Sequence, residues 1–136
     1  MQPTAILESA LYVTDLDAAE SFYAEVLGLE RIAKVEGRHA FFRCGHGVLL
    51  LFVAEATREP PPSGAKLPVP PHGTVGDGHL CFAASADEIE RWKARLTDKG
   101  IAIEADFMWP KGGRSIYFRD PSGNSLELAE PKIWNL

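Results

Sequence analysis

The chain has 136 residues, 46% of them hydrophobic and 24% charged, which is the composition of one folded globular domain. Its net charge of -5 argues against nucleic acid as a partner, because phosphate binding requires clustered Lys and Arg. The longest apolar run, residues 48–54, is too short to cross a membrane, and the N-terminus does not resemble a signal peptide. With only Cys44 and Cys81 we expect the reducing cytoplasm and no disulfide framework, although this one pair could still bridge.

The first half of the chain is predicted to form one strand, one helix and three further strands. Alternate residues from Ile6 to Tyr12 share one face of a predicted strand at residues 6–13. Thr14 or Asp15 can cap a helix whose apolar residues recur at helical spacing and which ends at Gly28. Glycine-containing turns separate three more predicted strands, at residues 30–36, 38–43 and 48–53.

The second half repeats this order of elements. Ser85 and Glu88 form a capping box at the start of a helix that ends at Gly100. We predict strands after the helix at residues 101–104, 114–119 and 125–129. The sequence therefore predicts a βαβββ unit twice.

Six prolines lie between the two units, in residues 54–77. A segment of this length without regular structure is usually a linker or a functional loop, and we interpret it as a linker. We predict one domain over residues 1–136. Its parts are module one at about 5–54, a linker at about 55–76, module two at about 77–130 and a tail at 131–136.

Three side chains occupy matching places in the two halves. Glu8 and His79 begin similar stretches about 71 positions apart, and Glu127 ends the second unit after an Arg and a Gly turn, as Leu51 ends the first. If the two copies face each other, His79 and the two carboxylates meet at a shared centre. One imidazole and two carboxylates suit a divalent metal ion.

Two stretches carry a resemblance that covers nearly the whole chain. They are Tyr12-Val13-Thr14-Asp15-Leu16 with Phe22-Tyr23 and Val26-Leu27-Gly28-Leu29, and Tyr117-Phe118-Arg119-Asp120-Pro121-Ser122-Gly123-Asn124 with Leu126-Glu127. They resemble the paired modules of the vicinal oxygen chelate superfamily, which includes glyoxalases, extradiol dioxygenases, fosfomycin transferases and bleomycin-binding proteins. The resemblance implies an α+β fold, in which two tandem βαβββ modules form an eight-stranded, incompletely closed barrel-like cleft.

The resemblance also implies metal ligands on the first and last strand of each module. The matching positions are Glu8, Leu51 (or a neighbouring Leu49 or Leu50), His79 and Glu127. Glu8 stands where relatives usually have His or Gln, and a leucine replaces the fourth ligand. We therefore expect one divalent ion, Mn, Ni, Fe, Zn or Mg, held by Glu8, His79 and Glu127, with positions open for substrate. Each residue also has a structural alternative, as a solvated strand residue or a core histidine.

Alternation along the strands predicts the substrate-binding face. Ser115, Tyr117 and Arg119 share one face of their strand, and His39 and Phe41 are counterparts in the first module. We predict that all five line a cavity, the alternative being a hydrated outer face of the sheet. Trp109, in a glycine-rich loop, either covers a flat substrate or docks against the scaffold.

By resemblance, we expect a metal-dependent lyase or isomerase that acts on a small vicinally oxygenated compound through a metal-chelated enolate or alkoxide. Glu127, or Glu8 from the other module, is the predicted proton shuttle. Two alternatives stay open: a metal-free, bleomycin-resistance-type drug-binding protein and an Fe(II) dioxygenase. A fosfomycin transferase is disfavoured, because its key Lys and its Ser appear here as Phe107 and Lys111. The resemblance also implies a homodimer, and the tail at 131–136 is a candidate contact between its two chains.

Overall fold

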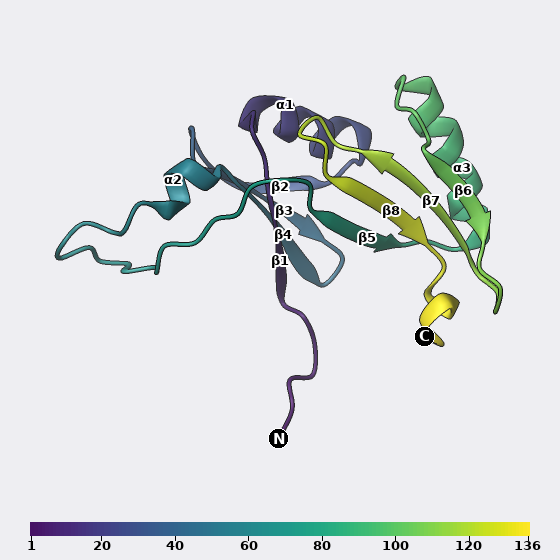
Figure 1. Ribbon diagram of the computed structural model, residues 1–136, viewed down its shortest axis with the longest axis horizontal. Helices are drawn as coiled ribbons and strands as arrows, with labels where there is room; N and C mark the ends of the chain where they lie inside the picture. The colour runs from purple at the N-terminus through teal and green to yellow at the C-terminus, as the bar shows by residue number, and fades with distance from the viewer. The chain divides into compact units, whose positions relative to one another are not determined.

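The computed structural model describes residues 1–136, which divide into two compact units, Met1–Gly76 and Asp77–Leu136 (Figure 1). Each unit contains one four-stranded sheet with its helices, in the order βαβββ. The predicted α+β fold with two tandem modules is thereby confirmed. The eight strands form two separate sheets and no closed barrel.

In the first unit the sheet has the order β1-β4-β3-β2, in which β1 and β4 are parallel and the other neighbours antiparallel. Its elements are β1 (Glu8–Tyr12), α1 (Leu16–Ser21), the π-helical turn η1 (Phe22–Val26), β2 (Glu30–Val35), β3 (His39–Cys44), β4 (Gly47–Phe52) and α2 (Ala54–Arg58).

In the second unit the sheet has the equivalent order β5-β8-β7-β6, again with only the first pair parallel. Its elements are β5 (His79–Ala83), α3 (Ala86–Asp98), β6 (Ala105–Met108), β7 (Arg114–Arg119), β8 (Ser125–Ala129) and the 3-10 helix η2 (Pro131–Trp134).

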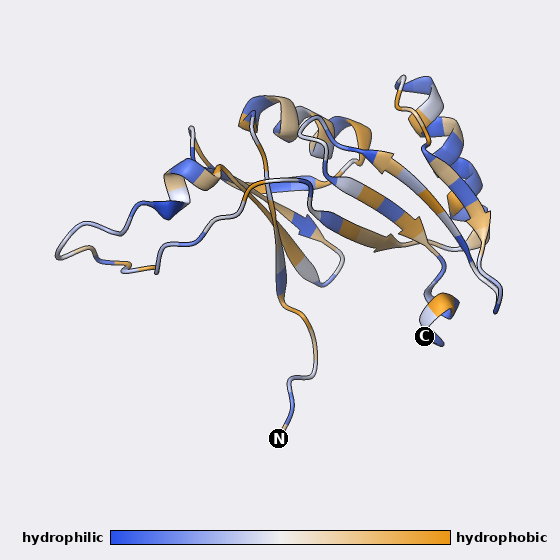
Figure 2. Ribbon diagram, viewed as in Figure 1, coloured by the Kyte–Doolittle hydropathy of each residue, from blue (hydrophilic) through white to orange (hydrophobic).

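One face of each sheet supplies the hydrophobic core. Side chains alternate along a strand, so every second residue points to the same face of the sheet. On this face Leu126 and Leu128 of β8 lie opposite Phe118 and Ile116 of β7, and all four side chains are buried. Figure 2 shows this alternation of polar and apolar residues along β7 and β8. Each such buried side chain contributes roughly 1.5–3 kcal/mol to stability. The polar residues between them are consequently presented on the opposite face.

Both predicted helix caps are confirmed. The Asp15 carboxylate accepts a hydrogen bond from the backbone N–H of Ala18 (3.0 Å) at the start of α1. Ser85 and Glu88 form the reciprocal capping box of α3, with the Ser85 N–H 2.7 Å from the Glu88 carboxylate. Beyond Ser21 the first helix widens into η1, which the sequence pattern did not indicate.

The strand predicted at residues 101–104 is wrong, since β6 begins only at Ala105. Gly100 ends α3 with a positive φ of 72°, and the Ile101 N–H then bonds back to the Leu96 carbonyl (2.8 Å). Gly100 and Ile101 therefore form the C-terminal cap of α3 and are not available to a strand. The first hydrogen bond to β7 runs from the Glu104 N–H to the Tyr117 carbonyl (2.8 Å).

Two further boundaries differ from the prediction. Ile6 and Leu7 are exposed and precede β1, although the Leu7 carbonyl still accepts a hydrogen bond from the Val48 N–H (3.1 Å). The segment interpreted as a linker begins with the helix α2, whose Thr57 is buried. Within this segment, the residues after α2 form neither helix nor strand.

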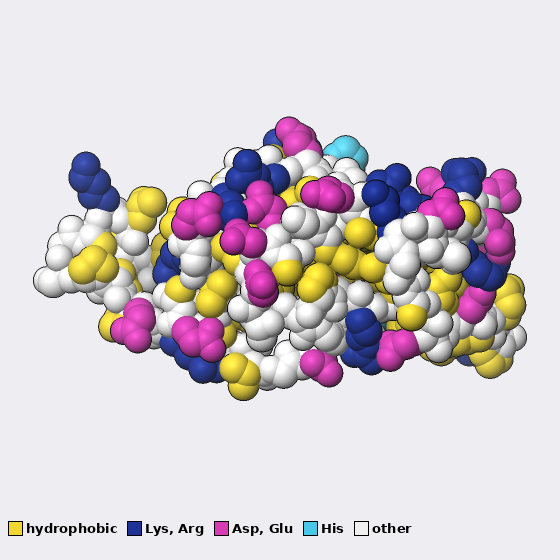
Figure 3. Space-filling view, turned by 90° about the horizontal axis from the view of Figure 1, so that it is seen from above, with side chains coloured by type: hydrophobic (Ala, Val, Ile, Leu, Met, Phe, Trp, Pro, Cys, Tyr) yellow, Lys and Arg dark blue, Asp and Glu magenta, His cyan; other side chains and the backbone are white.

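Charged side chains of both signs are intermixed over the face seen in Figure 3. Many are joined in ion pairs, such as Lys34 with Glu20 (2.6 Å) in the first unit. No helix is long and apolar enough to span a bilayer. Cys44 and Cys81 are both free thiols.

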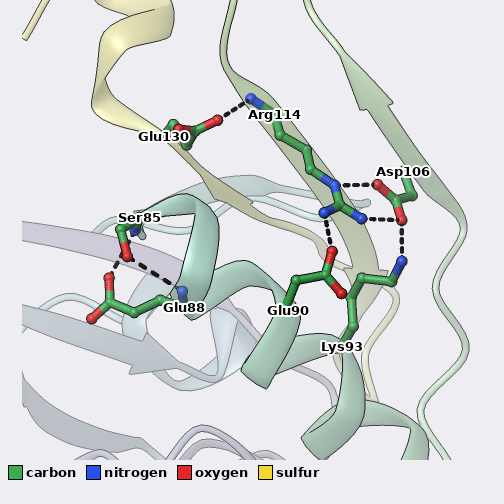
Figure 4. A network of polar contacts seen from close by, with 7 residues as sticks. All are labelled: Ser85, Glu88, Glu90, Lys93, Asp106, Arg114 and Glu130. Atoms are coloured by element: carbon green, nitrogen blue, oxygen red, sulfur yellow. Dashed lines mark hydrogen bonds and ion pairs between the residues drawn. The ribbon is translucent and has the colours of Figure 1, made fainter.

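An ion-pair network joins α3 to the edge of the second sheet (Figure 4). The Arg114 guanidinium donates to both oxygens of Asp106 (2.7 and 2.8 Å) and also contacts Glu90, and Lys93 donates to Asp106 (2.5 Å). The hydrogen bonds from Arg114 and then from Lys93 hold the pKa of Asp106 well below its usual range. The network is only partly solvent-exposed, so it should stabilise the fold more than an isolated surface pair does.

We expect Asp106→Asn to lower the free energy of unfolding by about 1 kcal/mol at neutral pH. Because folding depresses the pKa of Asp106, this stabilisation is fully present above the pKa of an unfolded aspartate, about 3.9, and is lost progressively as the pH falls from there through the depressed pKa of the folded state. Urea unfolding of both proteins from neutral to acidic pH measures the difference, which should shrink at the acidic end. An equal loss in Asp98→Asn, at the exposed end of α3, would contradict a specific role for the network.

Candidate active site

Four chemically active side chains lie on one face of the second sheet. In the parallel pair β5–β8, His79 lies opposite Ser125 and Cys81 opposite Glu127. In the antiparallel pair β7–β8, Tyr117 lies opposite Glu127. Since Glu127 alternates with the core residues Leu126 and Leu128, its side chain is on the face away from the core. His79, Cys81 and Tyr117 therefore surround Glu127 on three neighbouring strands.

His79 and Glu127 form the closest polar pair of this group. The His79 Nε2 is 3.3 Å from the Glu127 Oε2, and its Nδ1 is 3.0 Å from the carbonyl oxygen of Ser125. The carbonyl can only accept, so Nδ1 carries a proton and donates it. In the neutral ring, Nε2 then directs its lone pair toward a carboxylate. This arrangement requires a proton or a metal ion between the two atoms, and a backbone carbonyl that fixes the tautomer is typical of metal-binding histidines.

Glu127 also has an oxygen without a partner. The residue is only 5% exposed, and its Oε1 is buried with no hydrogen bond. An unpaired buried carboxylate oxygen costs on the order of 1–3 kcal/mol, which a bound cation would recover. The His79 Nε2 and Glu127 Oε2 are 3.3 Å apart, so one cation between them could contact both atoms.

The two neighbours of Glu127 hold their protons tightly. Burial and the adjacent Glu127 carboxylate raise the pKa of the Tyr117 hydroxyl to about 12. The same two causes, in the same order, raise the pKa of the Cys81 thiol to about 12. At neutral pH both groups are therefore hydrogen-bond donors beside a carboxylate, and Cys81 is not a thiolate.

An aromatic wall flanks this group. The ring of Phe107 stacks on that of Tyr117, with centroids 5.8 Å apart, and contacts Trp109 at 5.0 Å. The Trp109 Nε1 donates to the Ser115 hydroxyl (2.8 Å), so one edge of the indole contacts the scaffold, and its predicted contact with a flat substrate stays a prediction. Ser115 is fully buried. Phe107 and Trp109 each keep more than a third of their surface exposed.

Arg119 shares the face of Ser115 and Tyr117, but its guanidinium is already engaged. It donates to Glu104 (2.7 Å) and to the carbonyl oxygen of Gly123 (2.9 Å). These bonds hold it at the outer end of β7, where it stabilises the turn before β8. Its predicted contact with substrate stays a prediction.

The strand register in the first unit identifies the counterpart of Glu127. Leu50 lies opposite Phe41, as Glu127 lies opposite Tyr117, whereas Leu51 is in the core. Leu50 is therefore the counterpart of Glu127 in the first unit. Glu8 lies on the same face of the first sheet and is exposed. No group of three or more His, Cys, Asp or Glu side chains is placed to hold a metal, so the role of Glu8 as third ligand stays a prediction.

The first sheet presents aromatic residues where the second presents polar ones. The rings of His39 and Phe41 stack with centroids 4.1 Å apart, and burial lowers the pKa of His39. His72, to which sequence reasoning assigned no role, bonds through Nδ1 to the Tyr12 hydroxyl (2.7 Å) and packs on Phe52. Its position in a proline-rich segment gave no sign of this. The position of Cys81, two residues after His79 on a strand, could have been found by alternation.

The chain is similar to known proteins in sequence and in fold. The Glyoxalase/Bleomycin resistance protein/Dioxygenase superfamily profile matches residues 5–128. The chain is 30% identical over 121 residues to the glutathione transferase FosA of Serratia marcescens, covering 87% of this chain and 74% of that protein. It is 26% identical over 126 residues to the metallothiol transferase FosB of Bacillus licheniformis, covering 90% of this chain and 73% of that protein.

Two similar solved structures cover 96% or more of the chain. A lactoylglutathione lyase from Agrobacterium tumefaciens is 45% identical and superposes with a TM-score of 0.93 over 100% of both chains. The virulence protein STM3117 of Salmonella typhimurium is 28% identical, with a TM-score of 0.69 over 96% of this chain and 98% of that one.

Proposed function

The chain belongs to the glyoxalase/bleomycin resistance protein/dioxygenase superfamily, and from this membership we propose that it is a metal-dependent lyase or isomerase acting on a small compound with two adjacent oxygens. The observation that carries the proposal is the His79–Glu127 pair, in which a carboxylate with an unpartnered buried oxygen faces an imidazole of fixed tautomer. The similarity to a lactoylglutathione lyase, at 45% identity over the full length, supports a glutathione adduct as the substrate class.

The residues present fit a divalent cation. His79 and Glu127 would hold it, with Glu8 proposed as third ligand on the sequence repeat. Nitrogen and oxygen donors without a thiolate favour Mn, Ni, Fe, Zn or Mg. The bound cation would supply Lewis acidity to two neighbouring substrate oxygens.

The protein's own residues would move the proton and shape the site. We assign the proton transfer to the Glu127 carboxylate, whose Oε1 has no competing hydrogen bond. Tyr117 and Cys81, both protonated, can donate hydrogen bonds beside it. Phe107 and Trp109 provide an exposed apolar surface against which a substrate could pack and exclude water.

The test combines metal content with activity. We expect protein purified without chelator to hold about one equivalent of divalent metal per chain and to convert the glutathione–methylglyoxal hemithioacetal to lactoylglutathione, measured by ultraviolet absorbance. Chelation should abolish turnover, and addition of Mn²⁺, Ni²⁺ or Zn²⁺ should restore it. His79→Ala should lose metal and at least a hundredfold in rate, because a metal ligand is removed. Turnover that survives both chelation and the His79→Ala change would refute the proposal. If the protein instead transfers glutathione to fosfomycin and does not isomerise the hemithioacetal, it is a transferase.

A drug-binding function is the second candidate, and the aromatic face of the first unit favours it. Phe41, Phe52 and His39 form this face, and Leu50 stands where a polar ligand would be needed. Calorimetry with bleomycin on metal-free protein tests this function directly. Tight binding that is unaffected by His79→Ala would favour it, and absence of binding would leave the lyase or isomerase.

A further inference from the structure

Three aromatic rings form a row across the open face of the second sheet. Phe107 on β6 lies opposite Ser115 on β7. Tyr117, two residues further along β7, lies opposite Glu127 on β8, so these side chains share one face of the sheet. The Tyr117 ring is nearly parallel to that of Phe107 (8° between the planes, centroids 5.8 Å apart) and to that of His79 (21°, 6.2 Å). The row therefore leads from the edge strand β6 to the imidazole of the proposed metal-binding pair.

The ring of Phe107 at the outer end of this row is exposed but has fixed neighbours. It contacts the Trp109 indole, with centroids 5.0 Å apart and the planes at 65°. The indole is anchored by its hydrogen bond to the buried Ser115 hydroxyl (2.8 Å), and the Trp109 N–H bonds to the Gly113 carbonyl (2.8 Å). Phe107 nevertheless keeps 39% of its surface exposed. A ring that is exposed beside anchored neighbours offers a ligand a preformed apolar surface.

The ion-pair network at this edge of the sheet lies on the opposite face. Asp106 directly precedes Phe107 and lies opposite the core residue Ile116, so its side chain points away from the open face. Arg114 and Lys93 both donate to the Asp106 carboxylate (2.7 and 2.5 Å). These two cations are thus engaged with a carboxylate on the other face. The surface of Phe107 therefore suits an uncharged apolar group better than an anionic one.

We propose that Phe107 is a specificity-determining residue, which selects substrates with a flat, uncharged aromatic group on one of the two oxygen-bearing carbons. The inference rests on the proposed lyase or isomerase function and adds the substituent that the site prefers. In the adduct of a 2-oxoaldehyde with a thiol, this substituent is bonded directly to an oxygen-bearing carbon. Only the Tyr117 ring separates Phe107 from His79 in the row, so such a group lies beside the row when its oxygens are at the metal-binding pair. Aromatic groups gain from stacked and edge-to-face contacts, which these rings offer.

The experiment compares two substrates that differ only in this group, the glutathione hemithioacetals of phenylglyoxal and methylglyoxal, on the Mn²⁺-loaded full-length protein. The ratio of their kcat/KM values, phenyl over methyl, cancels the contributions of the shared thiol and oxygens. Phe107→Ala should lower this ratio about tenfold and change kcat/KM for the methyl substrate less than about twofold. Phe107→Leu, which keeps an apolar side chain on the strand, should lower the ratio less. Met108→Ala is the matched control, because Met108 is the next residue on β6, is 61% exposed and points to the other face, and it should leave the ratio unchanged.

Binding of the two products, S-mandeloylglutathione and S-lactoylglutathione, measured by isothermal titration calorimetry, gives a second readout that does not depend on turnover. A ratio that falls in both turnover and binding for Phe107→Ala supports the inference. If the wild type converts neither hemithioacetal, the proposed function and this inference both fail. If it converts them and Phe107→Ala leaves both ratios unchanged, the selectivity role is refuted and the proposed function stands. An equal loss for both substrates, with thermal melts showing that the variant folds, would also refute it, since a merely structural role does not distinguish phenyl from methyl.

Discussion

Glu127→Gln is expected to abolish metal binding and to leave the metal-free protein at least as stable as the wild type. The amide cannot act as an anionic ligand, so Mn²⁺ affinity should fall by more than a hundredfold and turnover with it. The Nδ1 of His79 already donates to the carbonyl oxygen of Ser125, so its Nε2 is free to accept in the neutral ring. In the metal-free protein the Gln amide can donate to this Nε2. We therefore expect the free energy of unfolding to rise by up to about 1 kcal/mol. Calorimetric Mn²⁺ titration and urea unfolding measure the two effects.

Glu130→Gln is the matched control, because Glu130 is also a buried carboxylate at the end of β8. Its oxygens are both engaged, with the Arg114 N–H (2.8 Å) and with Lys132 (2.8 Å), and these contacts, Lys132 first, lower its pKa. This variant should lose stability and keep its Mn²⁺ affinity, the reverse of Glu127→Gln. If both variants lose stability equally and bind metal equally, Glu127 is a structural residue.

The fold was largely predictable because the periodicity of each half has one physical solution. Alternation predicted that Ser115, Tyr117 and Arg119 share one face of their strand, and capping residues predicted where two helices begin. Such local sequence patterns do not specify which residues of two neighbouring strands lie opposite each other. The counterpart of Glu127 could be located only to within residues 49–51, and the register decides for Leu50, which lies opposite Phe41, over Leu51, which lies opposite the core residue Ala40.

The site was less predictable, because its decisive details are tertiary. The two carboxylate oxygens of Glu127 differ, because one faces His79 and the other has no hydrogen-bond partner. This difference comes from the packing of three strands and cannot be inferred from residue type. The role of His72 was missed for the same reason, since its partner Tyr12 is sixty residues away in sequence. Sequence alone also gave no sign of the hydrogen bond from the Trp109 indole to Ser115, which depends on the turn between β6 and β7.

Asp120→Ala is expected to be among the most destabilising single changes, at about 3 kcal/mol. The buried Asp120 carboxylate accepts three hydrogen bonds, from the Ser122 N–H, the Asn124 N–H and the Asn124 side-chain amide, each at 2.9 Å. Alanine leaves these donors without that acceptor, and two of them belong to Asn124, which is 2% exposed. Urea unfolding measures the loss. Asp77→Ala, at an exposed carboxylate that lies against the same turn, should cost less than about 0.5 kcal/mol.

The same change should also reach the candidate active site, because this turn sets where β5 begins. Asn124 accepts a hydrogen bond from the Gly78 N–H (2.7 Å), and the Gly78 carbonyl accepts from the Ser125 N–H (2.9 Å). These bonds place His79 beside the Ser125 carbonyl that fixes its tautomer. We therefore expect Asp120→Ala to weaken Mn²⁺ binding about tenfold under conditions where the variant is still folded. Unchanged affinity would show that β5 is held by its ladder with β8 alone, and that the turn stabilises the fold without positioning the ligand.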